Sequence, residues 1–357
     1  MNIYKALKSN LSLATTHECA RCVNTTANPT IKLNGLGLCQ VCANYDHRFD
    51  AKHLAKEREF FKKFIGQRGK SGRYDVMVGI SGGKDSTATL SAIKDLGFTP
   101  LAFTFDTGYY PKQNLPRAKS AARSLGVDHV VIDIRSYARA VDLKCFKLSA
   151  QLYDSVKEQG AAEKFRKAYA EGRRHYSARC KHALPFVRSC QLCRRLVIRG
   201  YYGEAAKRGI GLVVLGMNEW AGLSRGRYTG LRRLKPFKKG PAVTVAHFPF
   251  LFRRTIKDTR ATLKRLGWKL PKGESLIESN ANSCLFARAA EAAAARLLGF
   301  HPDTTRLARE VTAGFITKKQ ALAALARPHT YKKSVRQVLA EAGLVPGTKR
   351  KPLSSKQ

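Results

Sequence analysis

The sequence predicts an α/β protein in which helices cover both faces of a parallel sheet, preceded by a short cysteine-rich ribbon. Two observations lead to this prediction. Strand and helix signals alternate from Arg73 to about Phe300, which is typical of parallel strands joined by crossover helices. Residues 1–50 instead hold two Cys-x-x-Cys pairs among turn-forming residues. We therefore divide the chain into a ribbon (1–50), a helical connector (51–72), an α/β domain (73–300) and a helical, basic C-terminal segment (301–357).

The individual elements follow from the pattern of apolar residues. The charged stretch from Ala51 to about Arg68 predicts a helix, which ends in the polar turn Gly69–Gly72. Short apolar runs next to turn residues predict strands, and apolar residues at helical spacing predict helices. The predicted strands are Tyr74–Ile80, Thr99–Phe105, His129–Ile134 and Gly211–Leu215, and the predicted helices are Ser86–Leu96, Arg117–Leu125, Leu196–Lys207 and Ile256–Leu266. Ligands of such sheets bind beyond the carboxyl ends of the strands.

The composition limits the classes of function. The chain has 66 Lys and Arg against 25 Asp and Glu, a net charge of +41, yet 44% of its residues are hydrophobic. A packed core is therefore expected, and the positive field should attract polyanions, although a generally basic proteome would give the same charge. The N-terminus lacks a secretory signal, and no apolar run approaches the roughly 18 residues of a membrane helix. We expect a soluble, cytoplasmic protein with no membrane partner, in which the nine cysteines are spaced as metal ligands rather than disulfides.

The most specific motif is a glycine-containing loop between the first predicted strand and the helix after it. Its residues are Ser81, Gly82, Gly83, Lys84, Asp85 and Ser86. Glycines let successive N–H groups converge on one point, and the helix start, the lysine and the serines add further donors. The spacing differs from Walker A. The loop therefore predicts a phosphate or pyrophosphate site, with an ordinary Gly-Gly turn as the alternative.

At every position this loop resembles the SGGKDS signature of the PP-loop ATP pyrophosphatases. The resemblance implies that ATP is cleaved between its α- and β-phosphates: a substrate carbonyl oxygen takes AMP, pyrophosphate leaves, and a nucleophile displaces AMP. Lys84 and Asp85 become candidate catalytic residues, and Asp85 is the better candidate to contact Mg²⁺. Asp106, after the second strand, could hold Mg²⁺ or orient substrate, or could be a simple turn aspartate. We place Asp106 and Gly216 among the nucleotide-binding candidates.

The ribbon cysteines predict a structural zinc site. Cys19 and Cys22 form one Cys-x-x-Cys pair, Cys39 and Cys42 form the other, and sixteen residues separate the pairs. This spacing is that of Cys₄ zinc ribbons, in which four thiolates close a tetrahedral shell. Two chance pairs and a redox role are the alternatives.

A second cysteine group consists of Cys190, Cys193 and the distant Cys284. Three thiolates near an active site could hold a [4Fe–4S] cluster with one iron left open. The segment Cys190–Gly200, followed by GLVVLG, resembles the corresponding segment of the cluster-dependent tRNA thiolases of the PP-loop superfamily. Zinc, a catalytic dithiol of Cys190 and Cys193, or an inert Cys284 are the alternatives. Cys145 and Cys180 are interpreted as incidental.

Two basic patches resemble a nucleic-acid footprint. The first lies in a long insertion over residues 140–189 and continues to Arg195, with Tyr169, Tyr176 and Phe186 interleaved. The second, Arg225–Lys239, contains no acidic residue. Clustered cations with aromatic residues suit phosphate contacts and base stacking, whereas a solvated basic face is the alternative.

Taken as a whole, the chain resembles the N-acetyl sugar amidotransferases, a PP-loop family with an N-terminal cysteine ribbon. The segments that carry the resemblance are the ribbon, YDVMVGISGGKDST, LAFTFDTGYY, SLGVDHVVID, VVLGMNEW and LAREVTAGF. The resemblance implies a PP-loop fold, in the class of adenine nucleotide alpha hydrolases, and conversion of an acetamido to an acetamidino group with ammonia from a glutaminase partner.

Two other functions remain open. One is a [4Fe–4S]-dependent sulfurtransferase acting on tRNA or another nucleic acid with a sulfur-donor partner, although Gly216–Glu219 lacks the histidine and paired aspartates of the tRNA thiolases. The other is a non-catalytic RNA-binding ribbon protein. The polyanionic partner is accordingly either a nucleic acid such as tRNA or a nucleotide-activated sugar.

Overall fold

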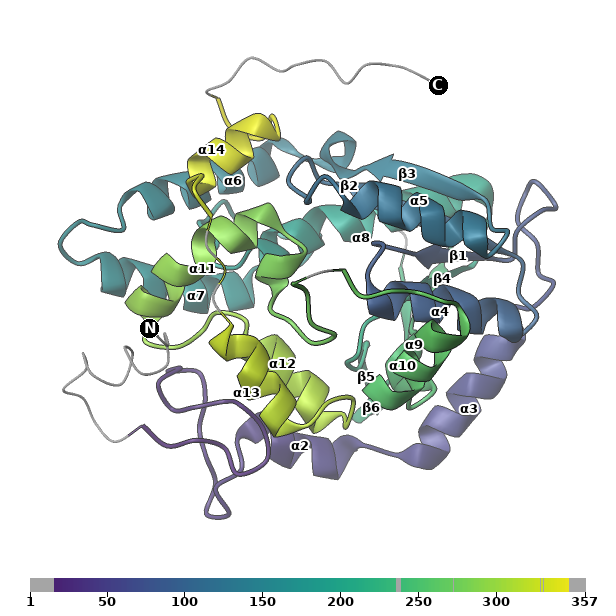
Figure 1. The fold of residues 1–357 in the computed structure, drawn as a ribbon, viewed down its shortest axis with the longest axis horizontal. Coiled ribbons are helices and arrows are strands. Elements are labelled where there is room, and N and C mark those ends of the chain that lie inside the picture. The colour runs from purple at the N-terminus through teal and green to yellow at the C-terminus, as the bar shows by residue number, and fades with distance from the viewer. Residues whose placement is uncertain (1–15, 236–238, 272, 328, 330, 347–357) are drawn as a thin grey trace.

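A six-stranded sheet lies at the centre of the α/β part of the chain (Figure 1). The structure is a computed structural model that describes residues 16–235, 239–271, 273–327, 329 and 331–346. The strands lie in the order β3-β2-β1-β4-β8-β7. Their bounds are β1 Val76–Gly79, β2 Pro100–Asp106, β3 His129–Asp133, β4 Leu212–Leu215, β7 Leu231–Leu234 and β8 Val243–His247. A separate hairpin pairs β5 (Gly222–Ser224) with β6 (Arg227–Thr229).

The predicted α/β class is confirmed, with one difference at the edge of the sheet. Five strands are parallel, but β7 runs antiparallel to β8. The sequence analysis predicted neither β7 nor β8. Arg232 and Arg233 occupy the middle of β7, so this edge strand has too few apolar residues to be recognised by its pattern.

Helices cover both faces of the sheet because alternate residues of a strand point to opposite sides. Val76 and Val78 pack with α4 (Lys84–Asp95) and α5 (Asn114–Ser124). Met77 packs on the other face with α8 (Ser189–Arg208). β2 and β3 lie on one side of β1, and β4 and β8 lie on the other, so the order in which strands are added to the sheet reverses at β1. Ligands of such sheets bind in the crevice beyond the carboxyl ends of the strands at this point.

The predicted helical connector covers the same face of the sheet as α4. Its helix, α3 (Ala51–Lys62), buries Leu54 and Phe61 in the core under α4. The helix ends before Arg68, since the chain turns at Gly66 with a φ of +76°. Three further helices belong to this region and to the sheet edge: η1 (Ile134–Tyr137), α9 (Phe248–Leu251) and α10 (Ile256–Arg265).

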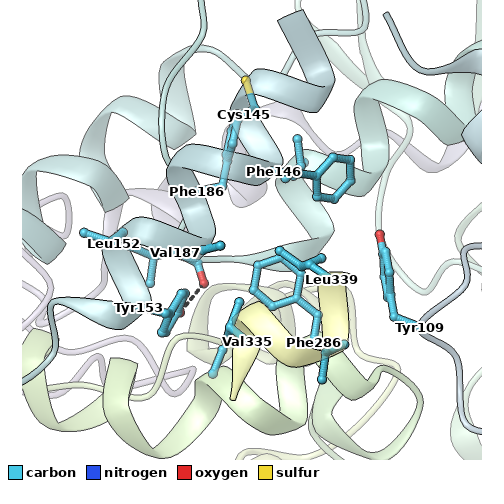
Figure 2. Close-up of a cluster of buried hydrophobic side chains, with 14 of the residues drawn as sticks. Tyr109, Cys145, Phe146, Leu152, Tyr153, Phe186, Val187, Phe286, Val335 and Leu339 are labelled. Carbon is cyan, nitrogen blue, oxygen red and sulfur yellow. Dashed lines mark hydrogen bonds between the residues drawn. The ribbon is translucent and has the colours of Figure 1, made fainter. Parts of the chain in front are cut away.

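A second core lies beside the sheet and contains the basic insertion. The insertion supplies α6 (Ala140–Asp154) and α7 (Ala161–Arg174), which pack with α11 (Leu285–Leu298) and α14 (Val335–Glu341). Figure 2 shows aromatic side chains of this core, with the Tyr153 hydroxyl donating to the carbonyl of Val187 at 2.7 Å. The insertion is therefore a folded helical unit that shares its core with the C-terminal helices.

The ribbon packs against helices from the far end of the chain. It includes α2 (Gln40–Arg48) and contacts α12 (Thr304–Thr312) and α13 (Lys318–Ala326) through a shared apolar cluster. The Lys318 ammonium donates to the carbonyl of Cys19 at 2.7 Å, across 299 residues of sequence. The short helix η2 (Asn280–Asn282) precedes α11.

Candidate active site at the carboxyl edge of the sheet

The phosphate-binding loop predicted from the sequence connects β1 to α4. Gly82 adopts a φ of +76°, and a Cβ there would lie 2.6 Å from the Cβ of Arg117 and 2.8 Å from the carbonyl oxygen of Asn114. Only glycine fits such a position. The turn at Gly82 brings the loop backbone close to α5 and aims the start of α4 at the crevice.

Hydrogen bonds within the loop fix its two serines. The Ser81 N–H donates to the Ser86 hydroxyl at 3.1 Å, and this hydroxyl donates to the Gly83 carbonyl at 3.1 Å. The helix begins after Gly83, which has no side chain to cap it. The first N–H groups of α4 therefore remain directed toward a ligand, as an anion-binding helix start requires.

Lys84 and Asp85 place a cation and an anion beside those N–H groups. Their side chains form an ion pair and are mostly buried. The Lys84 ammonium lies 5.8 Å from the ring centroid of Phe315. The Asp85 Oδ1 atom is buried and has no hydrogen-bond partner among the described residues. A phosphate group suits the loop, and a divalent cation such as Mg²⁺ suits this carboxylate oxygen.

Gly216 lies against the loop from the end of β4. A Cβ at this position would come within 3.1 Å of the Thr89 hydroxyl and 3.2 Å of the carbonyl group of Asp85. The segment after β4 therefore contacts α4 closely, and its glycine allows this approach.

Asp106 uses both of its carboxylate oxygens within the protein. Oδ1 accepts from the Gly108 N–H at 2.8 Å, and Oδ2 accepts from the Arg135 guanidinium at 2.8 Å. A turn aspartate makes such contacts. That Asp106 holds Mg²⁺ or orients substrate stays a prediction. The two hydrogen bonds fix the loop that leads to Tyr109 and Tyr110.

The four ribbon cysteines form a compact thiol cluster. All four are fully buried, and their sulfurs lie within 4.8 Å of one another. Cys22 Sγ lies 3.6 Å from Cys39 Sγ, and the Asn24 amide donates to Cys39 Sγ at 3.4 Å. Four sulfurs at this spacing fit a tetrahedral Zn²⁺ ion. In the part of the chain that the structure describes, no other group of three or more potential ligands is equally compact.

The second cysteine group comes together from two helix starts. Cys190 and Cys193 lie in the first two turns of α8, and Cys284 caps α11 by accepting from the Ala287 N–H at 3.4 Å. Cys190 is exposed, Cys193 half-buried and Cys284 buried. Burial raises the pKa of Cys193 to about 12 and that of Cys284 to about 11, and the neighbouring Cys190 thiol adds to both shifts. These two thiols are therefore protonated at neutral pH in the absence of a bound metal.

The loop after β2 connects this cysteine group with the nucleotide side of the site. Tyr109 is buried in the helical core (Figure 2), and its pKa lies well above the usual value because of burial and, after it, the nearby thiols Cys193 and Cys284. The Asn280 amide donates to the sulfur of Cys190 at 3.0 Å. The three sequence-predicted cysteines thus share one region.

Comparisons with known proteins match the part of the chain that carries the loop. The family model of the queuosine biosynthesis protein QueC matches residues 75–182. This segment contains β1, the loop Ser81–Ser86, β2 and β3. Over this segment the chain is similar to QueC, and the matched residues include the loop that resembles the PP-loop ATP pyrophosphatases.

Individual relatives match either about a quarter of the chain or nearly all of it. The chain is 36% identical over 95 residues to a 7-cyano-7-deazaguanine synthase of Citrifermentans bemidjiense and to one of Geobacter sp. strain M21. Each match covers 26% of this chain and 39% of the synthase. An uncharacterized protein of Methanocaldococcus jannaschii is 21% identical over 332 residues, which cover 92% of this chain and 99% of that protein.

Helix α12 adds residues to the PP-loop site for which the sequence analysis named no role. Glu310 is buried, and its carboxyl has a raised pKa because of burial and, less strongly, the nearby Asp85 carboxylate. Lys84 and Arg306 oppose this shift, and Arg306 forms an ion pair with Glu310. The motif LAREVTAGF was noted as part of a family resemblance, but only the fold shows that it lies over the PP-loop.

Part of the basic insertion is buried inside the protein rather than exposed as a basic surface. Arg195 is fully buried and pairs with the buried carboxylate of Asp142 at 2.9 Å, which Arg199 also contacts. Tyr169 and Phe186, expected to be available for base stacking, are buried in the helical core. That expectation is wrong for these two rings because they fill the space between α7 and its neighbours. Tyr176 remains half-exposed.

None of the helices in the described parts of the chain is long and apolar enough to cross a membrane. Part of the second basic patch, residues 236–238, lies outside the described residues, as do residues 347–357 of the basic C-terminal end.

Proposed function

We propose that this chain is an ATP-dependent enzyme that adenylates an amide or carbonyl oxygen of an acceptor and then replaces that oxygen with nitrogen. This is the reaction of an N-acetyl sugar amidotransferase, with ammonia from a glutaminase partner. The observation that carries the proposal is the PP-loop geometry, in which the positive φ of Gly82 and the uncapped start of α4 direct N–H groups and Lys84 toward one anion.

The loop residues have separate roles in this reaction. The N–H groups of α4 and the Lys84 ammonium hold the β- and γ-phosphates and stabilise the charge that develops on pyrophosphate. Asp85, with its unpartnered Oδ1 atom, would hold Mg²⁺ next to them. The hydroxyls of Ser81 and Ser86 complete the cradle.

The proposed reaction has two steps, adenylation of the acceptor oxygen and its replacement by nitrogen. The acceptor oxygen attacks the α-phosphorus of ATP, the bond from that phosphorus to the β-bridging oxygen breaks, and pyrophosphate leaves. Ammonia then attacks the activated carbon, AMP departs with the former acceptor oxygen, and the nitrogen loses a proton to solvent. Binding in a closed crevice favours the second step because water competes with ammonia for the same carbon.

A second candidate function has its own observation. Cys190, Cys193 and Cys284 lie within electrostatic range of one another, although among the described residues only the ribbon cysteines form a compact group of potential metal ligands. Three thiols in one region favour a [4Fe–4S]-dependent sulfurtransferase acting on tRNA. The relatives named 7-cyano-7-deazaguanine synthase match only 26% of this chain, so they do not favour a particular acceptor.

The test is pyrophosphate release from ATP by the full chain, purified without oxygen. One arm contains UDP-N-acetylglucosamine with ammonium chloride, and the other contains bulk tRNA with sulfide. Lys84→Ala should lower the rate by about 10²–10³-fold, as the loss of one preorganised charge donor does. Lys62→Ala, which removes an exposed lysine of α3, is the matched control.

The outcomes separate the candidates. Release in the first arm supports the amidotransferase, and release in the second arm together with bound iron supports the sulfurtransferase. RNA binding without pyrophosphate release in either arm would indicate a non-catalytic RNA-binding protein. A Lys84→Ala variant as active as the Lys62→Ala control would contradict the role of the loop.

A further inference from the structure

Three arginines from different elements surround the carboxyl ends of β4 and β8. We call them the arginine cluster: Arg194 of α8, Arg232 of β7 and Arg309 of α12. Leu215 and His247, the last residues of β4 and β8, are paired in the sheet at this edge. Glu219 follows β4 and is the carboxylate that the cluster contacts.

Arg309 is held in place from two sides. Its Nη1 atom donates to Glu219 Oε2 at 2.7 Å, and its guanidinium lies 5.6 Å from the ring centroid of Trp220. Trp220 in turn stacks near Tyr228, with ring centroids 4.3 Å apart. These contacts fix the direction of one guanidinium edge and leave its side chain partly exposed.

Arg194 and Arg232 have donors that the described residues do not use. The Arg194 guanidinium lies 5.1 Å from the ring centroid of Tyr176 and has no hydrogen bond or ion pair among the described residues. Arg232 Nη2 donates to the Tyr201 hydroxyl at 3.1 Å, but its Nε atom is buried without a hydrogen-bond partner there. A buried guanidinium donor without a partner is costly unless a ligand satisfies it.

The charges around the cluster do not cancel. Burial acts to raise the pKa of Glu219, but the charge and hydrogen bond of Arg309 outweigh it, and Arg194 adds to the lowering. His247 is neutral at pH 7, because burial lowers its pKa to about 4 and both Arg194 and Arg232 act in the same direction. Glu219 pairs with Arg309 and is influenced by Arg194, whereas Arg232 acts on the neighbouring His247. Three guanidinium groups and one carboxylate leave a net positive charge suited to an anion.

The cluster lies beside the PP-loop without being part of it. Gly216, three residues before Glu219, approaches the Asp85 backbone closely, and Glu310, the residue after Arg309, is within electrostatic range of Lys84. The PP-loop and the arginine cluster thus lie on either side of the segment after β4. ATP occupies the PP-loop in the proposed reaction.

We propose that the arginine cluster is a subsite for a phosphate ester of the acceptor, with Tyr176 and Trp220 holding the guanidinium groups of Arg194 and Arg309 in place for that phosphate. Arginine is well suited to this role, since its planar donors match phosphate oxygens and its face stacks on aromatic rings. The inference rests on the proposed function, because it assigns a part of the acceptor. Both a nucleotide-activated sugar and a nucleic acid carry such a phosphate.

The experiment measures equilibrium binding to the full chain without ATP. The probes are UDP-N-acetylglucosamine in one titration and labelled bulk tRNA in another. Arg194→Gln should weaken the binding of one of them by about 10- to 100-fold, the range expected for losing a charge-assisted hydrogen bond. Arg194→Lys should bind with intermediate affinity, since it keeps the charge but not the planar donors.

Arg233→Gln is the matched control. Arg233 is exposed and neighbours Arg232 on the same strand, where successive side chains point to opposite faces. This variant removes the same charge and should leave binding within about twofold of the native chain. ATP affinity, measured separately, should remain unchanged in Arg194→Gln.

The proposal is overturned if neither probe binds the native chain, or if Arg194→Gln binds both probes like the native chain. Equal weakening by Arg233→Gln would overturn it too, since it would indicate nonspecific charge attraction. So would an equal loss of ATP affinity in Arg194→Gln, which would place the cluster in the ATP site. If the proposed function is wrong but the subsite is right, no pyrophosphate is released in the activity assay, and binding of the probe still depends on Arg194.

Discussion

The Cys42 sulfur of the ribbon lies 3.1 Å from the hydroxyl of Thr312, the last residue of α12, and both groups are buried. The same helix carries Arg309 and Glu310 at the crevice. The ribbon therefore contacts the helix that lines the candidate active site. A metal ion in the ribbon would stabilise the position of α12 through this contact.

Thr312→Val tests this contact, since valine keeps the shape of threonine and removes the hydroxyl. Outer hydrogen-bond partners of metal ligands are commonly worth 10- to 100-fold in affinity, so we expect zinc to bind about tenfold more weakly. Competition with a chelating dye measures the affinity. Thr305→Val, on the same helix but hydrogen-bonded to Arg188, is the control and should keep native affinity.

Cys39→Ser should remove zinc from the ribbon. A serine oxygen is a poor substitute for a thiolate, and a structural site that loses a ligand loses much of its folding free energy. We expect less than one equivalent of zinc by elemental analysis and increased proteolysis around residues 16–48. Cys180→Ser, which changes a half-buried cysteine outside the ribbon, should retain the metal. Full zinc content in Cys39→Ser would refute the Cys₄ site.

Gly82→Ala should destabilise the PP-loop. The variant combines a φ of +76° with contacts as short as 2.6 Å, so we expect a loss of about 1–3 kcal/mol in thermal unfolding. At Gly83 the φ is −85° and the nearest atom to a new Cβ is the Ser81 hydroxyl at 3.4 Å. Gly83→Ala is therefore the control, and comparable losses in both variants would contradict the loop geometry.

Asp142→Asn should be among the most destabilising single changes in the helical core. It leaves the guanidiniums of Arg195 and Arg199 without their shared carboxylate, and breaking a buried pair in this way costs about 3–5 kcal/mol. Urea unfolding measures the loss. Asp154→Asn breaks the exposed pair with Arg336 and should cost at most about 1 kcal/mol. Similar midpoints for the two variants would argue against the buried triad.

The carboxylate of Asp303 should contribute a stability that depends on pH. Burial acts to raise its pKa, but the charges of Arg306 and Arg188 outweigh it and hold the pKa below the usual value. This contribution is fully present above the unfolded pKa of about 4 and is lost as the pH falls through the lower native value. The difference in unfolding free energy between the native chain and Asp303→Asn should therefore be constant from pH 5 to 7 and shrink below pH 4. A difference that grows on acidification would contradict the assignment.

The sequence alone predicts those elements whose structure depends on a local pattern of residues. The loop Ser81–Ser86, the four ribbon cysteines and strands β1 to β4 are contiguous motifs with their own periodicity or spacing. It was insufficient where long-range packing decides the role of a residue. Arg195 belongs to a basic run, yet it is fully buried because Asp142 lies opposite it.

The same limit applies to the crevice. Glu310 and Arg309 meet residues of the PP-loop and of the β4 end that lie about 90 or more positions away in the chain, and no local pattern in α12 indicates those partners. The buried ring of Phe186 is a similar case, since its neighbours come from α6 and α7.

The contact between Lys318 and Cys19 across 299 residues has a consequence for biosynthesis. The ribbon leaves the ribosome before α12 and α13, which cover its apolar side and follow roughly 15 to 60 s later at ordinary rates of translation. During that interval the ribbon thiols lack their final packing partners. Metal loading that depends on α12 would then be completed only after most of the chain has been made, and a nascent chain truncated before α12 should hold zinc less tightly than the full chain.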